Sequence, residues 1–176
     1  TFSAQAALGK LGELRDSLVG RLGGVLLLAL LAAVGLILLR VPLIRVLYEG
    51  GSFTSRSTEM VAWALLWYAL GLVGHSVLEV IVRAFYALHD TRTPVLVGVI
   101  AMSLNVAFSF LFARLYAAWG WMPHGGLALA NSLATFLEMS VLLFLLRRRL
   151  GGLGGAGVPR ALLLGALGSL GMGLVL

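Results

Sequence analysis

Residues 22–39 read LGGVLLLALLAAVGLILL, an unbroken apolar run that lies between Arg21 and Arg40. A hydrocarbon core about 30 Å thick is crossed by roughly 20 residues of apolar helix, so this run has the length of one membrane span. The two arginines stand where the lipid headgroups would begin, a position that suits charged side chains. The run therefore predicts a transmembrane helix at about 22–40.

Three further apolar runs of similar length follow along the chain. We expect spans at about 58–88, 94–114 and 125–147, and the shorter run 161–176 predicts the start of a truncated transmembrane helix. Hydrophobic residues make up 60% of the sequence and charged residues only 11%, whereas about a quarter of a soluble domain is charged. Too few polar side chains remain to cover a water-facing surface. The predicted fold class is an all-α, polytopic bundle of transmembrane helices.

The segments outside these spans are short. Residues 1–21 alternate charged and apolar residues at helical spacing and predict an amphipathic cytoplasmic linker helix, lying either at the membrane surface or in solvent. Residues 150–160 predict a basic, glycine-rich cytoplasmic loop. The sequence starts at Thr1 and its last apolar run reaches Leu176, so we expect an internal fragment of a longer protein.

Basic residues are unevenly divided between the two sides of the expected membrane. Nine lie on the side of the N-terminus, namely Lys10, Arg15, Arg21, Arg83, Arg92, Arg147, Arg148, Arg149 and Arg160. Four lie on the other side, namely Arg40, Arg45, Arg56 and Arg114. Because Lys and Arg concentrate in cytoplasmic loops, this bias predicts a cytoplasmic N-terminus. The net charge of +6 then reflects contact with lipid headgroups, and we expect no nucleic-acid partner.

No catalytic site is recognisable in the sequence. Cysteine is absent, which excludes a thiolate metal site and a cysteine nucleophile. The sequence also lacks a metal-spaced histidine cluster, a paired-carboxylate motif and a phosphate-binding glycine loop. We therefore expect a transporter, with no catalytic residue, no cofactor and no certain metal ligand.

Three ionisable residues share one face of the second expected span. His75, Glu79 and Arg83 follow one another at i, i+4 and i+8. Ionisable groups inside a membrane usually face a bundle interior or a water-filled cavity, so these residues are candidates for lining a substrate path. The alternative is that Glu79 and Arg83 lie near the cytoplasmic end and extend to the headgroups.

Polar residues in the third and fourth spans are candidates for a cation site or for ion coupling. Asn105 and Ser109, at i and i+4, could offer oxygen atoms to a hard cation such as Na⁺. A hydrogen bond between helices is the favoured alternative for this pair. Glu138 ends a stripe of small residues that begins at Gly126. The small residues predict close helix packing, and Glu138 is a candidate for proton or cation coupling.

The turn between the second and third spans carries the most specific pattern. Residues 83–94, RAFYALHDTRTP, resemble the signature R-x-FYA-x-x-DTRTP of the MurJ (MviN) family. The signature residues of this turn are Phe85, Tyr86, Asp90, Thr91, Arg92, Thr93 and Pro94. Residues 47–53 (LYEGGSF) and 125–133 (GGLALANSL) also look like family segments, in the family's order. Within the turn we expect Thr93 to cap the third span and Pro94 to begin it.

This resemblance implies both a fold and a function. The family consists of lipid II flippases of bacterial peptidoglycan synthesis, so the chain would be part of a two-lobed, fourteen-helix transporter in the bacterial cytoplasmic (inner) membrane. Its implied partners are membrane lipids and the undecaprenyl-diphosphate-linked peptidoglycan precursor, which would move from the inner to the outer leaflet by alternating access.

The resemblance leaves the driving force open. Some members bind Na⁺ with the asparagine that matches Asn105 and with an acidic residue one turn later, where this sequence has Ser109. Coupling to Na⁺, to H⁺ or to the membrane potential are therefore all retained. Glu79 also departs from many relatives, so a role for it is not implied by the family.

Other functions are compatible with the sequence. A related exporter of drugs or of other lipid-linked oligosaccharides would share the two-lobed fold. A non-transporting pseudo-flippase that acts as a scaffold would share the helices as well. A polytopic membrane enzyme would need catalytic residues outside this sequence.

Overall fold

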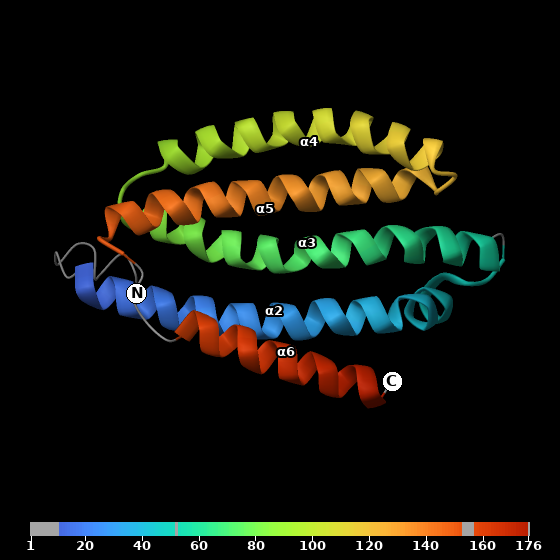
Figure 1. Cartoon of the computed structure of the whole chain (residues 1–176), viewed down its shortest axis with the longest axis horizontal. Helices are drawn as coiled ribbons and strands as arrows, with labels where there is room; N and C mark the ends of the chain where they lie inside the picture. Colours follow the sequence, from blue (N-terminus) through green and yellow to red (C-terminus); the bar gives the residue numbers. More distant parts are fainter. Residues whose placement is uncertain (1–10, 52, 153–156, 176) are drawn as a thin grey trace.

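The computed structural model describes residues 11–51, 53–152 and 157–175. These residues form five helices: α2 (Leu11–Tyr48), α3 (Ser55–Ala87), α4 (Arg92–Ala118), α5 (Pro123–Arg149) and α6 (Gly157–Val175). The helices lie side by side in one row, in the order α4, α5, α3, α2, α6 (Figure 1). Consecutive helices α3 and α4 are thus separated by α5, which packs against both.

The predicted fold class is confirmed. Four of the described helices, α2 to α5, are long and apolar enough to cross a membrane. The apolar part of α6 is shorter. Many large apolar side chains lie on the outside of the row, including Ile100, Met102 and Phe110 of α4. Such a surface suits contact with lipid or with further apolar helices.

Helix α2 differs from the sequence prediction at both ends. We predicted a separate linker helix over residues 1–21, but residues 11–48 form one continuous helix of 38 residues; residues 1–10 lie outside the described part of the chain. Six of residues 11–21 are Leu, Glu or Arg, which favour a helix, and no turn sequence ends the helix before the apolar run. At the other end Pro42 lies inside the helix. Such a helix is about 57 Å long and extends beyond the hydrocarbon core.

Close approach of α5 to its neighbours depends on glycine. A Cβ atom added at Gly126 of α5 would lie 2.7 Å from the backbone carbonyl atoms of Phe112 in α4. A Cβ atom added at Gly71 of α3 would lie 2.9 Å from Cβ of Ser132 in α5. The Ser132 hydroxyl donates a hydrogen bond to the carbonyl oxygen of Trp67 at 2.7 Å. The small-residue stripe of α5 therefore packs between helices, as predicted.

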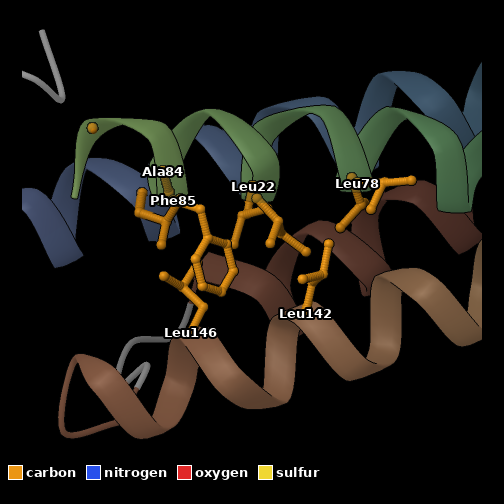
Figure 2. Close-up of a cluster of buried hydrophobic side chains, with 10 residues drawn as sticks. Leu22, Leu78, Ala84, Phe85, Leu142 and Leu146 are labelled. Atoms are coloured by element: carbon orange, nitrogen blue, oxygen red, sulfur yellow. The ribbon is translucent and has the colours of Figure 1, made fainter. Parts of the chain in front are cut away.

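A cluster of buried hydrophobic side chains holds three helices together near the end of α3. Its labelled members come from α2 (Leu22), α3 (Leu78, Ala84, Phe85) and α5 (Leu142, Leu146), and Figure 2 shows them converging. The Phe85 side chain is fully buried between α3 and α5. Phe85 belongs to the signature turn, so the position of that turn depends on this cluster.

The turn from α3 to α4 ends α3 with a left-handed residue. His89 has φ of 59°, while Asp90 N donates to the carbonyl oxygen of Phe85 at 3.0 Å and His89 N donates to that of Tyr86 at 3.0 Å. This pattern is the Schellman motif, in which glycine normally takes the left-handed position. At the opposite end of the helices, Gly120 (φ 73°) takes the left-handed position after α4.

Candidate functional site

Asp90 caps the N-terminus of α4. Its carboxylate accepts hydrogen bonds from the Thr93 backbone N–H at 3.0 Å and from the Thr93 hydroxyl at 2.6 Å. These bonds, led by the one from the Thr93 hydroxyl, lower the pKa of the Asp90 carboxyl below its ordinary value. Our prediction for this turn was wrong, because α4 begins at Arg92 and Pro94 lies within its first turn. A carboxylate accepts more strongly than a hydroxyl, so Thr93 donates instead of capping.

The signature turn is also bonded to the end of α5. Arg149 Nη2 lies 2.6 Å from Asp90 Oδ2, and the Arg149 guanidinium lies 5.6 Å from the centre of the Phe85 ring. Asp90 therefore serves two elements at once, as the cap of α4 and as the ion-pair partner of α5. Among the other signature residues, Pro94 is buried, whereas Tyr86, Thr91 and Arg92 are exposed. Sequence reasoning missed the Arg149 contact.

The predicted polar stripe lies on an exposed face of α3. His75, Glu79 and Arg83 are all exposed, and Arg83 Nη2 donates to Glu79 Oε1 at 2.6 Å. An open groove of about 400 Å³ runs along this face, and its lining residues are Leu72, His75, Ser76, Leu78, Glu79 and Val82. Two of the three ionisable residues of the stripe, His75 and Glu79, therefore line this otherwise largely apolar groove.

Asn105 takes part in a hydrogen bond between α4 and α5. Its Nδ2 donates to Oδ1 of Asn131 at 3.3 Å, and the Ser109 hydroxyl donates to Oδ1 of Asn105 at 3.3 Å. This is the arrangement that we gave as the alternative to a cation site. Sequence reasoning missed Asn131, although it lies within one of the family-like segments.

Glu138 lies apart from the Asn105 group, at the level of the α3 stripe. Its side chain is half-buried, and a Cβ atom added at Gly98 of α4 would lie 3.2 Å from its Oε1. Asn131 and Glu138 are two turns apart on α5, about 10 Å. The cation candidates therefore divide into two groups, and within the described residues no three His, Asp or Glu gather closely enough to hold a metal.

Taken together, these residues cross three helices. Asn105 and Asn131 join α4 to α5, and Glu138 follows on the same face of α5 because residues at i and i+7 align. The stripe that begins at His75 lies on α3, which packs against α5. From His75 the stripe continues to Arg83. The polar track is defined by its members Asn105, Ser109, Asn131, Glu138, His75, Glu79 and Arg83.

All four tryptophans of the chain gather toward the end of the helices that lies opposite the signature turn. Trp63 of α3 lies edge-to-face against Trp67 and Trp121, with ring centroids 5.7 Å apart in both pairs. Trp119 and Trp121 are 5.6 Å apart, and the buried Tyr116 packs 5.3 Å from Trp121. Such rings are enriched at membrane–water interfaces. Sequence reasoning missed this cluster.

Glu49 organises the turn from α2 to α3 at that same end. Its carboxylate accepts hydrogen bonds from Ser55 at 2.8 Å, from Thr58 at 3.2 Å and from Arg45 at 3.0 Å. The bond from Ser55 is the largest cause that lowers the pKa of the Glu49 carboxyl. Sequence reasoning gave no role to this residue.

Comparison with known proteins gives one consistent result. The model of the family described as "Lipid II flippase MurJ" matches residues 1–173. A probable lipid II flippase MurJ of Vibrio cholerae serotype O1 is 36% identical over 118 residues, which cover 67% of this chain and 21% of the relative. The lipid II flippase MurJ of Thermosipho africanus is 35% identical over 111 residues, which cover 63% and 22%.

A solved structure agrees with this result. A lipid II flippase MurJ in an inward closed conformation superimposes with a TM-score of 0.72 and 26% sequence identity. The superposition covers 96% of this chain and 40% of that chain. The chain spans about a fifth of the length of the curated relatives that it matches.

Proposed function

Because this chain belongs to the lipid II flippase MurJ family, we propose that it forms part of a transporter that moves a lipid-linked peptidoglycan precursor across the bacterial cytoplasmic membrane. The match of the family to residues 1–173 supports this function most directly. Members of the family act as transporters, and we propose no catalytic reaction for this chain. Its substrate would be the undecaprenyl-diphosphate-linked precursor, within a membrane of ordinary phospholipids.

The polar track supports a direct role for these helices in transport. The precursor has a polar head, which needs hydrated or polar surroundings while its lipid tail stays in the hydrocarbon. The track provides such groups at successive depths across α4, α5 and α3. Arg83 lies at the end of the track next to the signature turn, where a guanidinium can attract a diphosphate. Its ion pair with Glu79 offsets part of that charge.

The orientation of the chain is a second part of the proposal. We place the signature turn and the end of α5 in the cytoplasm, since basic residues concentrate there. The tryptophan cluster would then lie at the outer interface. A reporter enzyme that is active only outside the cytoplasm should be active when fused after Ser55 and silent when fused at Asp90. The reverse pattern would contradict this orientation.

The energy source that drives transport is a third part of the proposal. Asn105 and Ser109 could contribute oxygen atoms to a Na⁺ site, but both are engaged in hydrogen bonds with each other or with Asn131. Glu138 offers a carboxylate two turns away on α5. Na⁺ coupling would need further ligands beside Asn105 and Ser109, because Glu138 lies apart from them, whereas proton coupling needs only ionisable groups already present.

Complementation tests the proposed function. The full-length protein that carries this chain is expressed in a bacterium depleted of its own lipid II flippase, and the precursor in the outer leaflet is measured with an impermeant probe. Growth and outer-leaflet precursor should both be restored. Restored export of a cationic dye without restored precursor would instead identify a drug exporter, and restoration of neither would contradict transport.

A further inference from the structure

The last turns of α2 stay apolar beyond the arginine that ends its apolar run. Arg40 closes the run 22–39, but residues 41–48 read VPLIRVLY, in which Arg45 is the only charged residue. These residues are still helical, because α2 ends at Tyr48. Contiguous apolar surface that continues past a membrane span marks a contact with protein or with lipid. We call residues 41–48 the end segment of α2.

One side of the end segment is held by the start of α3. Ile44 is buried. Arg45 forms an ion pair with Glu49, the residue directly after the segment, at 3.0 Å. The Glu49 carboxylate also accepts hydrogen bonds from Ser55 at 2.8 Å and from Thr58 at 3.2 Å, both in the first turn of α3. The segment is therefore fixed to the rest of the row on this side.

The other side of the end segment is apolar and exposed. The exposed fraction is 83% for Val46 and 62% for Leu47, and Leu43 is exposed on the same side. These three residues share one face because they are spaced at i, i+3 and i+4, whereas Arg45 lies on another face. Within the described part of the chain, no helix covers this apolar face. The end segment is thus amphipathic.

A straight α2 would carry this apolar face past the membrane. Val46 follows Arg40 by six residues, which is about 9 Å along a helix axis. The headgroup region on each side of the hydrocarbon is only about 5–7 Å thick. Pro42 lies between the two residues and lacks the N–H that would bond to the Leu38 carbonyl oxygen, so it kinks the helix. Figure 1 shows the coil of α2 changing direction near its end.

The contacts to α3 also relate the end segment to the tryptophan cluster. Glu49 is bonded to Thr58, and Trp63 of that cluster follows Thr58 by little more than one turn, about 8 Å along α3. Tryptophan rings are enriched where the hydrocarbon meets the headgroups. An apolar face beside this level, turned by the kink, is therefore level with phospholipid and lies beyond the depth at which transmembrane helices pack.

We propose that the end segment is an interfacial anchor, whose apolar face is inserted among the phospholipids on the side of the tryptophan cluster. An amphipathic helix in this plane buries its apolar face about 5–10 Å into the boundary between headgroups and acyl chains. Arg45, on another face, reaches the headgroups. The anchor does not depend on the proposed function. Only the naming of this leaflet as the outer one rests on the proposed orientation.

Spin labels measure the depth of each residue and test the anchor. Val46→Cys, Leu47→Cys and Arg45→Cys are labelled one at a time in the full-length protein, freed of other cysteines and reconstituted in phospholipid nanodiscs. Collisions with oxygen, which concentrates in the bilayer, are compared with collisions with a water-soluble nickel chelate. The ratio of oxygen to nickel accessibility should be several times higher at positions 46 and 47 than at position 45.

Two results would overturn the anchor. An equal ratio at the three positions would show that the apolar face is not inserted in lipid. Low accessibility of positions 46 and 47 to both reagents would show that protein covers them, either another part of the full chain or a second copy. Neither result bears on precursor transport, so the anchor can fail while the proposed function stands.

The kink is tested separately with the label at position 46. Pro42→Ala restores the missing N–H and allows the helix to continue straight, so the nickel accessibility of that label should rise. Gly35→Ala, earlier in α2, adds a methyl group that meets nothing within 4 Å and should leave the label unchanged. An unchanged label in Pro42→Ala would overturn the role of Pro42, while the depth profile of the wild-type helix still decides the anchor.

Discussion

Arg149 Nη2 lies 2.6 Å from Asp90 Oδ2, so the last residue of α5 is bonded directly to the turn that joins α3 to α4. In Figure 1, α5 lies between those two helices. The ion pair joins these three helices at the end that carries the signature turn. At the opposite end of the same helices, the tryptophan cluster packs α3 against the turn between α4 and α5. The polar track crosses the same three helices between these two ends.

Substitutions at this ion pair should separate its two roles. Asp90→Ala removes both the cap of α4 and the ion pair, whereas Asp90→Asn keeps an acceptor for the Thr93 N–H. Arg149→Gln removes the ion pair and the contact of the guanidinium with the Phe85 ring, but it leaves the cap in place. We expect Asp90→Ala to lower the melting temperature about twice as far as the other two. Arg148→Gln, whose guanidinium lies over the Phe144 ring and not beside a carboxylate, is the matched control. Equal losses for Asp90→Ala and Asp90→Asn would contradict the capping role.

Acid should weaken this turn in a defined range. The hydrogen bonds from Thr93 lower the pKa of Asp90 from its ordinary value of 3.8. A carboxyl whose pKa is lowered by folding contributes stability that is complete above its unfolded value and is lost as the pH falls through the native value. Unfolding in detergent at pH 2 to 5 should therefore depend more steeply on pH in the wild type than in Asp90→Asn. Parallel curves would contradict the assignment.

The left-handed residue of the same turn offers a stabilising substitution. His89 has φ of 59°, a conformation that costs a residue with a Cβ atom roughly 1 kcal/mol relative to glycine. His89→Gly should raise the melting temperature in detergent by a few degrees. His89→Ala keeps the Cβ atom and should give no gain. A gain with alanine equal to that with glycine would show that the imidazole, and not the backbone, is responsible.

Glycine at the contact between α4 and α5 should be irreplaceable. Gly126→Ala places a methyl group 2.7 Å from the Phe112 backbone, so the helices must separate at a cost of about 1–3 kcal/mol. Gly35→Ala in α2 meets nothing within 4 Å and should be neutral or slightly stabilising. Melting temperatures of the two variants in detergent compare these costs. Similar values would mean that α4 and α5 do not pack this closely.

The sequence predicted the membrane spans because the length of an apolar run is a property of the chain itself. It did not predict that α2 continues through residues 11–48, since a change from charged to apolar residues does not by itself end a helix. The predicted cap of α4, Thr93, was wrong because Asp90 and Thr93 are both residue types that cap helices. Only the geometry shows that Thr93 is the donor.

Contacts between residues of different helices could not be predicted from the sequence, for a different reason. Arg149 meets Asp90, and Asn131 meets Asn105, because α5 lies between α3 and α4. The sequence of an apolar helix carries little information about which other helix packs beside it. Gly71 and Gly126 permit the close contacts, but glycine is frequent throughout this sequence, with 23 residues, and does not identify them in advance.

Thiol labelling tests most directly whether the polar track lines the path of the lipid-linked head. The chain has no native cysteine, so single cysteines at positions 75 and 79 report without background from it. In the full-length protein, both should react with a membrane-impermeant maleimide, and added lipid-linked precursor should slow the reaction. Cysteines at Val77 and Ile81, which are buried, should react little with or without the precursor. Protection confined to positions 75 and 79 is the predicted result, and equal labelling at all four positions, unaffected by the precursor, would contradict it.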